Sequence, residues 1–167
     1  FIGNSIFGNS LGIDLGQWGV TYNDTADGDN GPNGLLNFPI LEGAESTGDT
    51  ISIVVSYNSK PSRTYGLDFY WSQTCNASGF GEGEIYLGYA PVTTDSSGNV
   101  GPSQIGIFST INRRGFITAT ATDSDGSTSE FSQCITLEGV DEFNIFPPPL
   151  TSPAPQLFEL LRKNSIG

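Results

Sequence analysis

The feature that most constrains the fold is an alternation of apolar and polar residues in short segments that begin near residue 49. In ISIVVSYN, the side chains of Ile51, Ile53 and Val55 would share one face of a strand, because successive side chains of a strand point to opposite faces. Similar segments follow, separated by turn-forming residues: GLDFYWS, EIYLGYAPV, IGIFSTI, FITATAT and EFSQCITLE. Short alternating strands spaced by turns indicate an all-β protein and favour an antiparallel β-sandwich.

The chain divides into three segments around these strands. Residues 1–43 contain an N-terminal arm and an Asp/Asn/Gly-rich loop, residues 44–138 hold the predicted sandwich, and residues 139–167 form a Pro-rich linker with a short helix-like tail. Residues 17–43 are long for a connection without structure, so we expect something to hold them in place. The prolines favour extended geometry, and the tail is too short to be a stable helix alone.

The net charge of −12, from 18 acidic and 6 basic residues, limits the possible partners. The chain lacks the basic surface that binds nucleic-acid phosphates, and an anionic membrane surface would repel it. No apolar run approaches the roughly 18 residues of a membrane-spanning helix. We therefore expect no nucleic-acid partner and no membrane insertion. We interpret the missing leader sequence as a sign of a mature chain or a piece of a larger secreted protein.

Histidine is absent, which excludes Ser-His-Asp and Cys-His catalysis and histidine-bearing metal sites. Two carboxylate pairs remain as candidates for glycosidase chemistry: Glu82 with Glu84, and Asp68 with Glu130. Such a pair must lie about 5–10 Å apart across a cleft, and small sandwiches rarely form one. We therefore expect a protein that is not an enzyme.

Cys75 and Cys134 are too few for a zinc site without histidine, so we predict that they form a disulfide; the alternative is two buried free thiols. A disulfide indicates an oxidising compartment, which places the protein outside the cell or on its surface. The triplets at Asn23 and Asn76 fit the N-glycosylation sequon. They would carry glycans only in a eukaryotic host.

Cys134 has the opposite strand parity to Phe131, Ile135 and Leu137. If those three apolar residues face the core, Cys134 faces outwards. Two arrangements would reconcile this with a disulfide. Either a β-bulge lies near residues 132–133, or Cys75 lies in a loop that reaches around the edge of the sheet.

Oxygen-bearing side chains cluster within the loop of the first segment: Asn23, Asp24, Asp27, Asp29, Asn30 and Asn33. Hard oxygen ligands on a Gly-rich loop suit Ca²⁺, which would also explain how a long loop keeps its shape. A second candidate calcium site contains Asp123 and Asp125, with Glu130 nearby. The spacing does not match an EF-hand, and both sites can equally be read as turns built by Asp, Asn and Gly.

Aromatic residues supply candidates for stacking on sugar rings: Trp18, Tyr22, Tyr70 and Trp71. The alternation places Trp71 in the core beside Phe69. Tyr70 and Tyr86 are then the residues expected to face outwards. In a sandwich strand such aromatic residues more often cover the core than bind a ligand.

A resemblance to a known class of proteins rests on several unusual strings in order. NSIFGNSLGIDLGQWGVTYND and DGDNGPNGLLNFPIL resemble the last rung and exit segment of right-handed parallel β-helix repeat proteins, which are large secreted or surface proteins. FYWSQTCNASGFGEGEIYLG and FITATATDSDGSTSEFSQC resemble the Ig-like sandwich module that follows such an exit segment. The resemblance covers about residues 3–137 and lacks the preceding rungs. It implies an Ig-like β-sandwich that caps a β-helix.

The opening residues 1–16 repeat Gly-Asn-Ser between apolar positions. A β-helix rung buries its face only by stacking on neighbours, and its Asn side chains bond to the next rung. We therefore expect this stretch to pair with something. Three partners are open: upstream rungs that are missing from the chain, the sheet of another copy that receives residues 1–16 as a donated strand, or the chain's own sandwich.

Together these patterns predict a non-catalytic structural or adhesion module of an extracellular or cell-surface protein, with calcium as the one candidate cofactor. One alternative is a subunit of an extracellular filament assembled by strand donation between copies. Another is a carbohydrate-binding module of a larger enzyme. The expected partners are accordingly other copies of the chain, upstream β-helix rungs or glycans.

Overall fold

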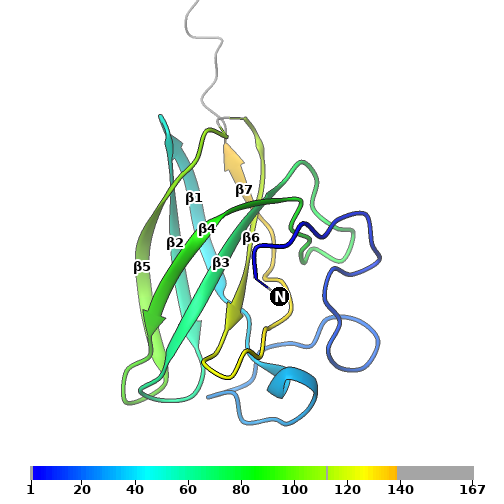
Figure 1. Cartoon of the computed structure of the whole chain (residues 1–167), viewed down its shortest axis with the longest axis vertical. Coiled ribbons are helices and arrows are strands. Elements are labelled where there is room, and N and C mark those ends of the chain that lie inside the picture. Colours follow the sequence, from blue (N-terminus) through cyan, green and yellow to red (C-terminus); the bar gives the residue numbers. More distant parts are fainter. Residues whose placement is uncertain (1, 112, 139–167) are drawn as a thin grey trace, which may run out of the picture.

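The computed structural model describes residues 2–111 and 113–138 (Figure 1). The Pro-rich linker and helix-like tail predicted for residues 139–167 lie outside this part. The described part is all-β, which confirms the all-β class, whereas the Ig-like sandwich arrangement stays a prediction. Besides a short 3-10 helix, η1 (Pro32–Leu35), its regular elements are the strands β1 (Ile40–Thr47), β2 (Thr50–Asn58), β3 (Thr64–Ser72), β4 (Ile85–Thr93), β5 (Asn99–Phe108), β6 (Gly115–Thr122) and β7 (Ile135–Glu138).

The strands form one sheet with the order β4-β3-β6-β7-β1-β2-β5. Every neighbouring pair is antiparallel except β1 and β7, which run parallel, so the sheet is mixed. The sheet curves until its two edge strands, β4 and β5, approach each other (Figure 1). A Cβ atom at Gly88 of β4 would lie 3.0 Å from Cγ2 of Ile107 in β5. The fold is therefore a barrel that is nearly closed.

Alternating side chains of all seven strands fill the interior of the barrel. In β2, Ile51, Ile53 and Val55 are fully buried, as the alternation predicts. Trp71 of β3 belongs to the same core, which confirms its predicted place. Strands β3 and β6 are buried on their outer faces as well, so something covers the barrel on this side.

One part of the cover is the segment between β3 and β4, because Glu82 O accepts a hydrogen bond from Thr118 of β6 and a Cβ at Gly83 would lie 2.7 Å from the Tyr70 ring. The other part is the N-terminal segment of residues 2–22, here called the arm. It lies beside the β3–β6–β7 side of the barrel (Figure 1). Ile13 packs there with Tyr70 and Phe131 in a second apolar cluster outside the barrel, and Ile6 and Leu15 pack against this cluster. The arm therefore occupies the third of the three places considered for it, the chain's own sheet.

The structure differs from the predicted strands at two places. The first strand begins at Ile40, inside the segment assigned to the loop. The sequence pattern missed its start because a bulge between Leu41 and Gly43 breaks the alternation of side chains. The predicted strand over residues 130–138 is regular only from Ile135. Phe131 precedes it and packs outside the barrel, whereas Leu137 packs inside.

Candidate functional site

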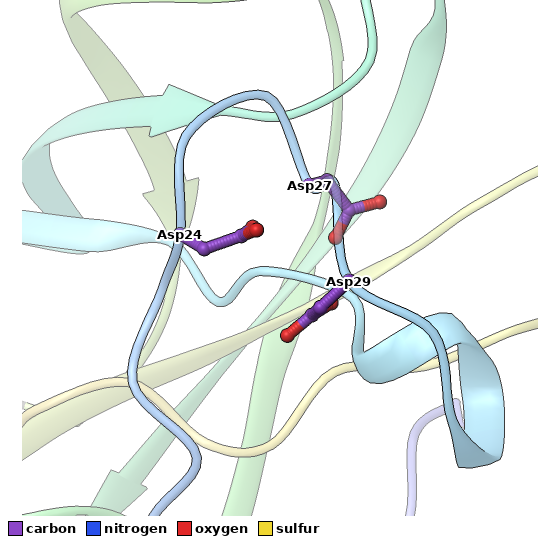
Figure 2. Close-up of side chains that lie close together, drawn as sticks. All are labelled: Asp24, Asp27 and Asp29. Atoms are coloured by element: carbon purple, nitrogen blue, oxygen red, sulfur yellow. The ribbon is translucent and has the colours of Figure 1, made fainter.

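The acidic loop between the arm and η1 brings three predicted calcium ligands together. Asp24, Asp27 and Asp29 each place one carboxylate oxygen within 4.8 Å of the other two. Figure 2 shows the three side chains close together on one loop, with the Asp24 carboxylate directed towards Asp27 and Asp29. Sequence reasoning named these residues, and the fold gives them a common centre.

Two local features bend the loop around this centre. Ala26 and Asp27 adopt positive φ angles of 59° and 54°, a left-handed conformation that turns the chain back sharply and that Asp tolerates well. The backbone N–H of Gly28 donates to both carboxylate oxygens of Asp24, at 3.1 Å each. The loop is thus closed by its own acidic side chain.

Asn37 fastens the loop to the barrel. Its side chain accepts a bond from Asp24 N at 3.0 Å, and it donates to Asp24 O and to Asn58 O at 2.9 Å each. Its backbone N–H donates to Asp27 Oδ1 at 3.0 Å. Sequence reasoning missed this residue, because an Asn in a Gly-rich stretch resembles any other turn former.

The cluster is deficient in positive charge. Asp27 is 2% exposed, and its Oδ2 atom accepts no hydrogen bond, although Lys60 Nζ lies 3.5 Å away. Oδ1 of Asp29 is also buried without a hydrogen bond. Burial raises the pKa of Asp29, and the carboxylates of Asp24 and Asp27 raise it further. Three acids therefore face one ammonium group, and carboxylate oxygens are the ligands that Ca²⁺ prefers.

The second predicted calcium site is arranged as a turn. Oδ1 of Asp123 accepts the backbone N–H groups of Asp125 and Ser127, both at 2.9 Å. This is an Asx-type turn, and the Asp125 side chain is exposed. Glu130 is engaged elsewhere. Within residues 2–111 and 113–138, the Asp24–Asp27–Asp29 group is the one cluster of three such ligands.

The arm is attached by two buried carboxylates, which we call the arm junction. Glu82 accepts the N–H groups of Gly8 and Asn9 at 2.7 and 2.8 Å. Glu130, 2% exposed, accepts those of Leu15 and Thr21 at 2.9 Å each. Glu82 and Glu130 were considered as parts of catalytic pairs, but their oxygens are occupied by backbone donors.

Backbone pairing completes the arm junction. Ile6 and Gly83 exchange two hydrogen bonds of 2.8 Å, as in an antiparallel bridge. Asn4 and Asn9 donate to the carbonyl oxygens of Ile2 and Phe7 in their own chain. The amide nitrogens of both asparagines of the repeat thus bond to carbonyl groups two residues earlier in the arm.

The predicted disulfide joins Cys75 and Cys134, whose Cα atoms are 6.1 Å apart. Cys75 lies in the segment between β3 and β4, and Cys134 directly precedes β7. The parity conflict is resolved by the loop position of Cys75 and by the late start of β7. The bridge fastens the β3–β4 segment, which carries Glu82, to the barrel.

Both sequon asparagines use the amide nitrogen to which a glycan would be attached. Nδ2 of Asn23 donates a hydrogen bond to the carbonyl oxygen of Phe38 at 2.8 Å, and Oδ1 of Asn23 accepts one from the backbone N–H of Phe38 at 2.9 Å. Nδ2 of Asn76 donates to Asn9 O at 3.0 Å and so joins the arm. In the folded chain these two side chains hold distant backbone segments together through hydrogen bonds.

The candidate sugar-stacking residues are divided between surface and interior. Tyr70, expected to face outwards, does leave the barrel core, but the arm covers it to 2% exposure. Trp18 is fully exposed, and Tyr22 largely so. Trp18 borders a surface hollow of about 470 Å³ together with Asp14, Gly16 and Gln17.

Comparisons with known proteins add no family: no protein-family model matches the sequence, and no curated protein matches it. Within the part of the chain that the structure describes, no helix has the length and apolar character needed to cross a membrane.

Proposed function

We propose that this chain is a non-catalytic structural module of an extracellular or cell-surface protein, and that its barrel holds the arm in a fixed position. The observation that carries the proposal is the arm junction. Glu82 and Glu130 accept four backbone N–H groups of the arm. Hydrogen bonds to charged acceptors are about twice as strong as neutral ones, so the arm is a built part of the module.

The disulfide supports the proposed location, because such bonds persist mainly in oxidising compartments. The proposed partner on the N-terminal side of the arm is a parallel β-helix, as the resemblance of residues 3–137 to an exit segment and an Ig-like module implies. In that arrangement the barrel caps the helix, and the arm sets the orientation between the two.

Hydrogen exchange of the arm amides tests the proposal. E130Q replaces one accepting oxygen by an N–H donor, so the amides of Leu15 and Thr21 should lose about tenfold or more of their protection. E82Q should have the same effect on Gly8 and Asn9. E45Q, on the exposed side of β1, serves as the control. Arm amides that exchange at unfolded-chain rates in the wild type would overturn the proposal.

A second candidate function, glycan binding, is supported by Trp18. An exposed indole can stack on the apolar face of a sugar, and the side chains of Asp14 and Gln17 beside it can bond to hydroxyl groups. On a glycan array, W18A should lose the binding that the wild type shows. F108A, which removes an exposed aromatic ring from β5, should keep it. An array on which the wild type binds no glycan would reject this function.

A further inference from the structure

We propose that Asp24, Asp27 and Asp29 form a calcium site that fixes the loop between the arm and β1. One carboxylate oxygen of each residue lies within 4.8 Å of the other two, and the three side chains lie close together on the loop (Figure 2). The proposal goes beyond the function proposed above and is independent of it, because Glu82 and Glu130 take no part in this cluster.

An acidic cluster alone would not indicate a ligand, but this one contains buried oxygens that accept no hydrogen bond. Oδ2 of Asp27 and Oδ1 of Asp29 are both buried and accept no hydrogen bond. The Asp27 residue as a whole is 2% exposed. A buried carboxylate oxygen without a hydrogen bond is costly, and a cation bound among the three carboxylates would offset that cost.

Hydrogen bonds within the protein already hold the carboxylates of Asp27 and Asp24 in position. Oδ1 of Asp27 accepts a hydrogen bond from the backbone N–H of Asn37, and the Asp24 carboxylate accepts one from the backbone N–H of Gly28. These bonds orient the carboxylates before any ion arrives, in the way that outer partners orient metal ligands. A site of this kind needs little rearrangement to bind.

The donor set favours Ca²⁺ over Mg²⁺. Three carboxylates on an irregular loop can supply a variable number of oxygens, which suits the flexible coordination of Ca²⁺ by 6–8 oxygens. Mg²⁺ demands near-ideal octahedral geometry and loses its water reluctantly. We expect a dissociation constant of about 10⁻⁴–10⁻³ M, in the range of extracellular calcium modules.

Lys60 is the rival explanation, because its ammonium group lies 3.5 Å from Oδ2 of Asp27. Lys60 is half exposed and makes no hydrogen bond to that oxygen. One ammonium also cannot balance three carboxylates. If a calcium ion binds, Lys60 competes with it, so K60M should bind Ca²⁺ more tightly than the wild type.

Calorimetric titration of the EDTA-treated protein with CaCl₂, and its melting temperature with and without Ca²⁺, test the proposal. The wild type should bind Ca²⁺ and melt at a higher temperature. D29N should weaken binding about tenfold or more, because it removes one of three charged ligands. The carboxylates of Asp24 and Asp27 hold the backbone N–H groups of Gly28 and Asn37, and D29N leaves both of these bonds in place. D125N removes the same charge from the Asx turn and should behave as the wild type.

The outcomes separate the two explanations. Binding that is lost in D29N, kept in D125N and strengthened in K60M supports the site. Absence of heat and of a melting shift in both the wild type and K60M overturns it and leaves Lys60 as the sole counter-ion. Equal weakening by D29N and D125N would also overturn it, because it would indicate diffuse attraction to an acidic protein.

Discussion

At the scale of single residues, the buried carboxylates of the described residues differ in whether their oxygens accept hydrogen bonds. Glu82 and Glu130 each accept two backbone N–H groups of the arm, so burial leaves them satisfied. Asp68 of β3 is also fully buried, but neither of its oxygens has a hydrogen bond of good geometry. Burial therefore raises the pKa of Asp68, and the nearby Tyr86 hydroxyl offsets part of that effect.

This difference predicts how stability depends on pH. A raised pKa in the folded state means that the folded chain holds the proton more tightly than the unfolded chain does. The stability contributed by protonated Asp68 is thus lost as the pH rises from the ordinary value of 3.8 through the higher folded-state pKa. D68N should be more stable than the wild type at neutral pH and should lose that advantage below pH 3.8.

Urea denaturation across this pH range measures the effect. D49N is the control, because Asp49 lies in the exposed turn between β1 and β2. A constant difference between D68N and the wild type at every pH would refute the assignment to Asp68.

The sequence could predict part of the site at this scale. Asp24, Asp27 and Asp29 are close in the chain, so a local reading of the loop found them. Glu82 and Glu130 could not be assigned in this way, because their partners Gly8 and Leu15 lie 74 and 115 positions away. A pairing that depends on how an irregular arm folds back leaves no periodic signal.

At the scale of elements, alternation predicted the strands that are regular and failed where they are not. Strand β2 follows the pattern from end to end. The bulge between Leu41 and Gly43 hid β1. Tyr70 faces outwards from β3 as expected, but the arm packs on it, so it is not exposed. The periodicity of a sequence describes a regular strand. It does not predict a bulge within the strand, and it does not show which other segment covers the sheet.

The disulfide acts at this scale because it ties the β3–β4 segment to the start of β7. Replacing Cys75 and Cys134 by serine opens a loop of about 60 residues and should cost about 4 kcal/mol of unfolding free energy. Because Glu82 lies in the fastened segment, the amides of Gly8 and Asn9 should lose more protection than those of Leu15 and Thr21, which Glu130 holds.

Chemical denaturation and residue-resolved hydrogen exchange of the C75S/C134S double variant check this prediction. Equal loss of protection across the whole arm would contradict the specific link between the disulfide and Glu82.

At the scale of the whole molecule, the barrel is protected against pairing with other copies. Pro91 and Pro102 interrupt the two edge strands, β4 and β5, and proline cannot donate to a strand ladder. The arm makes its backbone pairs within its own chain. We therefore expect a monomer, although exchange of arms between copies would preserve the same contacts and is the basis of the filament alternative.

Size-exclusion chromatography with light scattering over a range of concentrations distinguishes the two. The monomer should persist at all concentrations, and deletion of residues 2–16 should expose Tyr70 and Phe131 and lower the melting temperature. Large particles that dissociate after this deletion would instead establish strand donation between copies.

The parallel pairing of β1 with β7 has a consequence for tension. Ala44 lies opposite Leu137 and Glu45 opposite Glu138. Because the two strands run in the same direction, the start of β1 and the end of β7 lie at opposite ends of the pair. A pull outwards on Ile40 and Glu138 slides the two strands past each other. This loads the hydrogen bonds between the two strands in shear, so all of them bear the force at once and they do not break one after another.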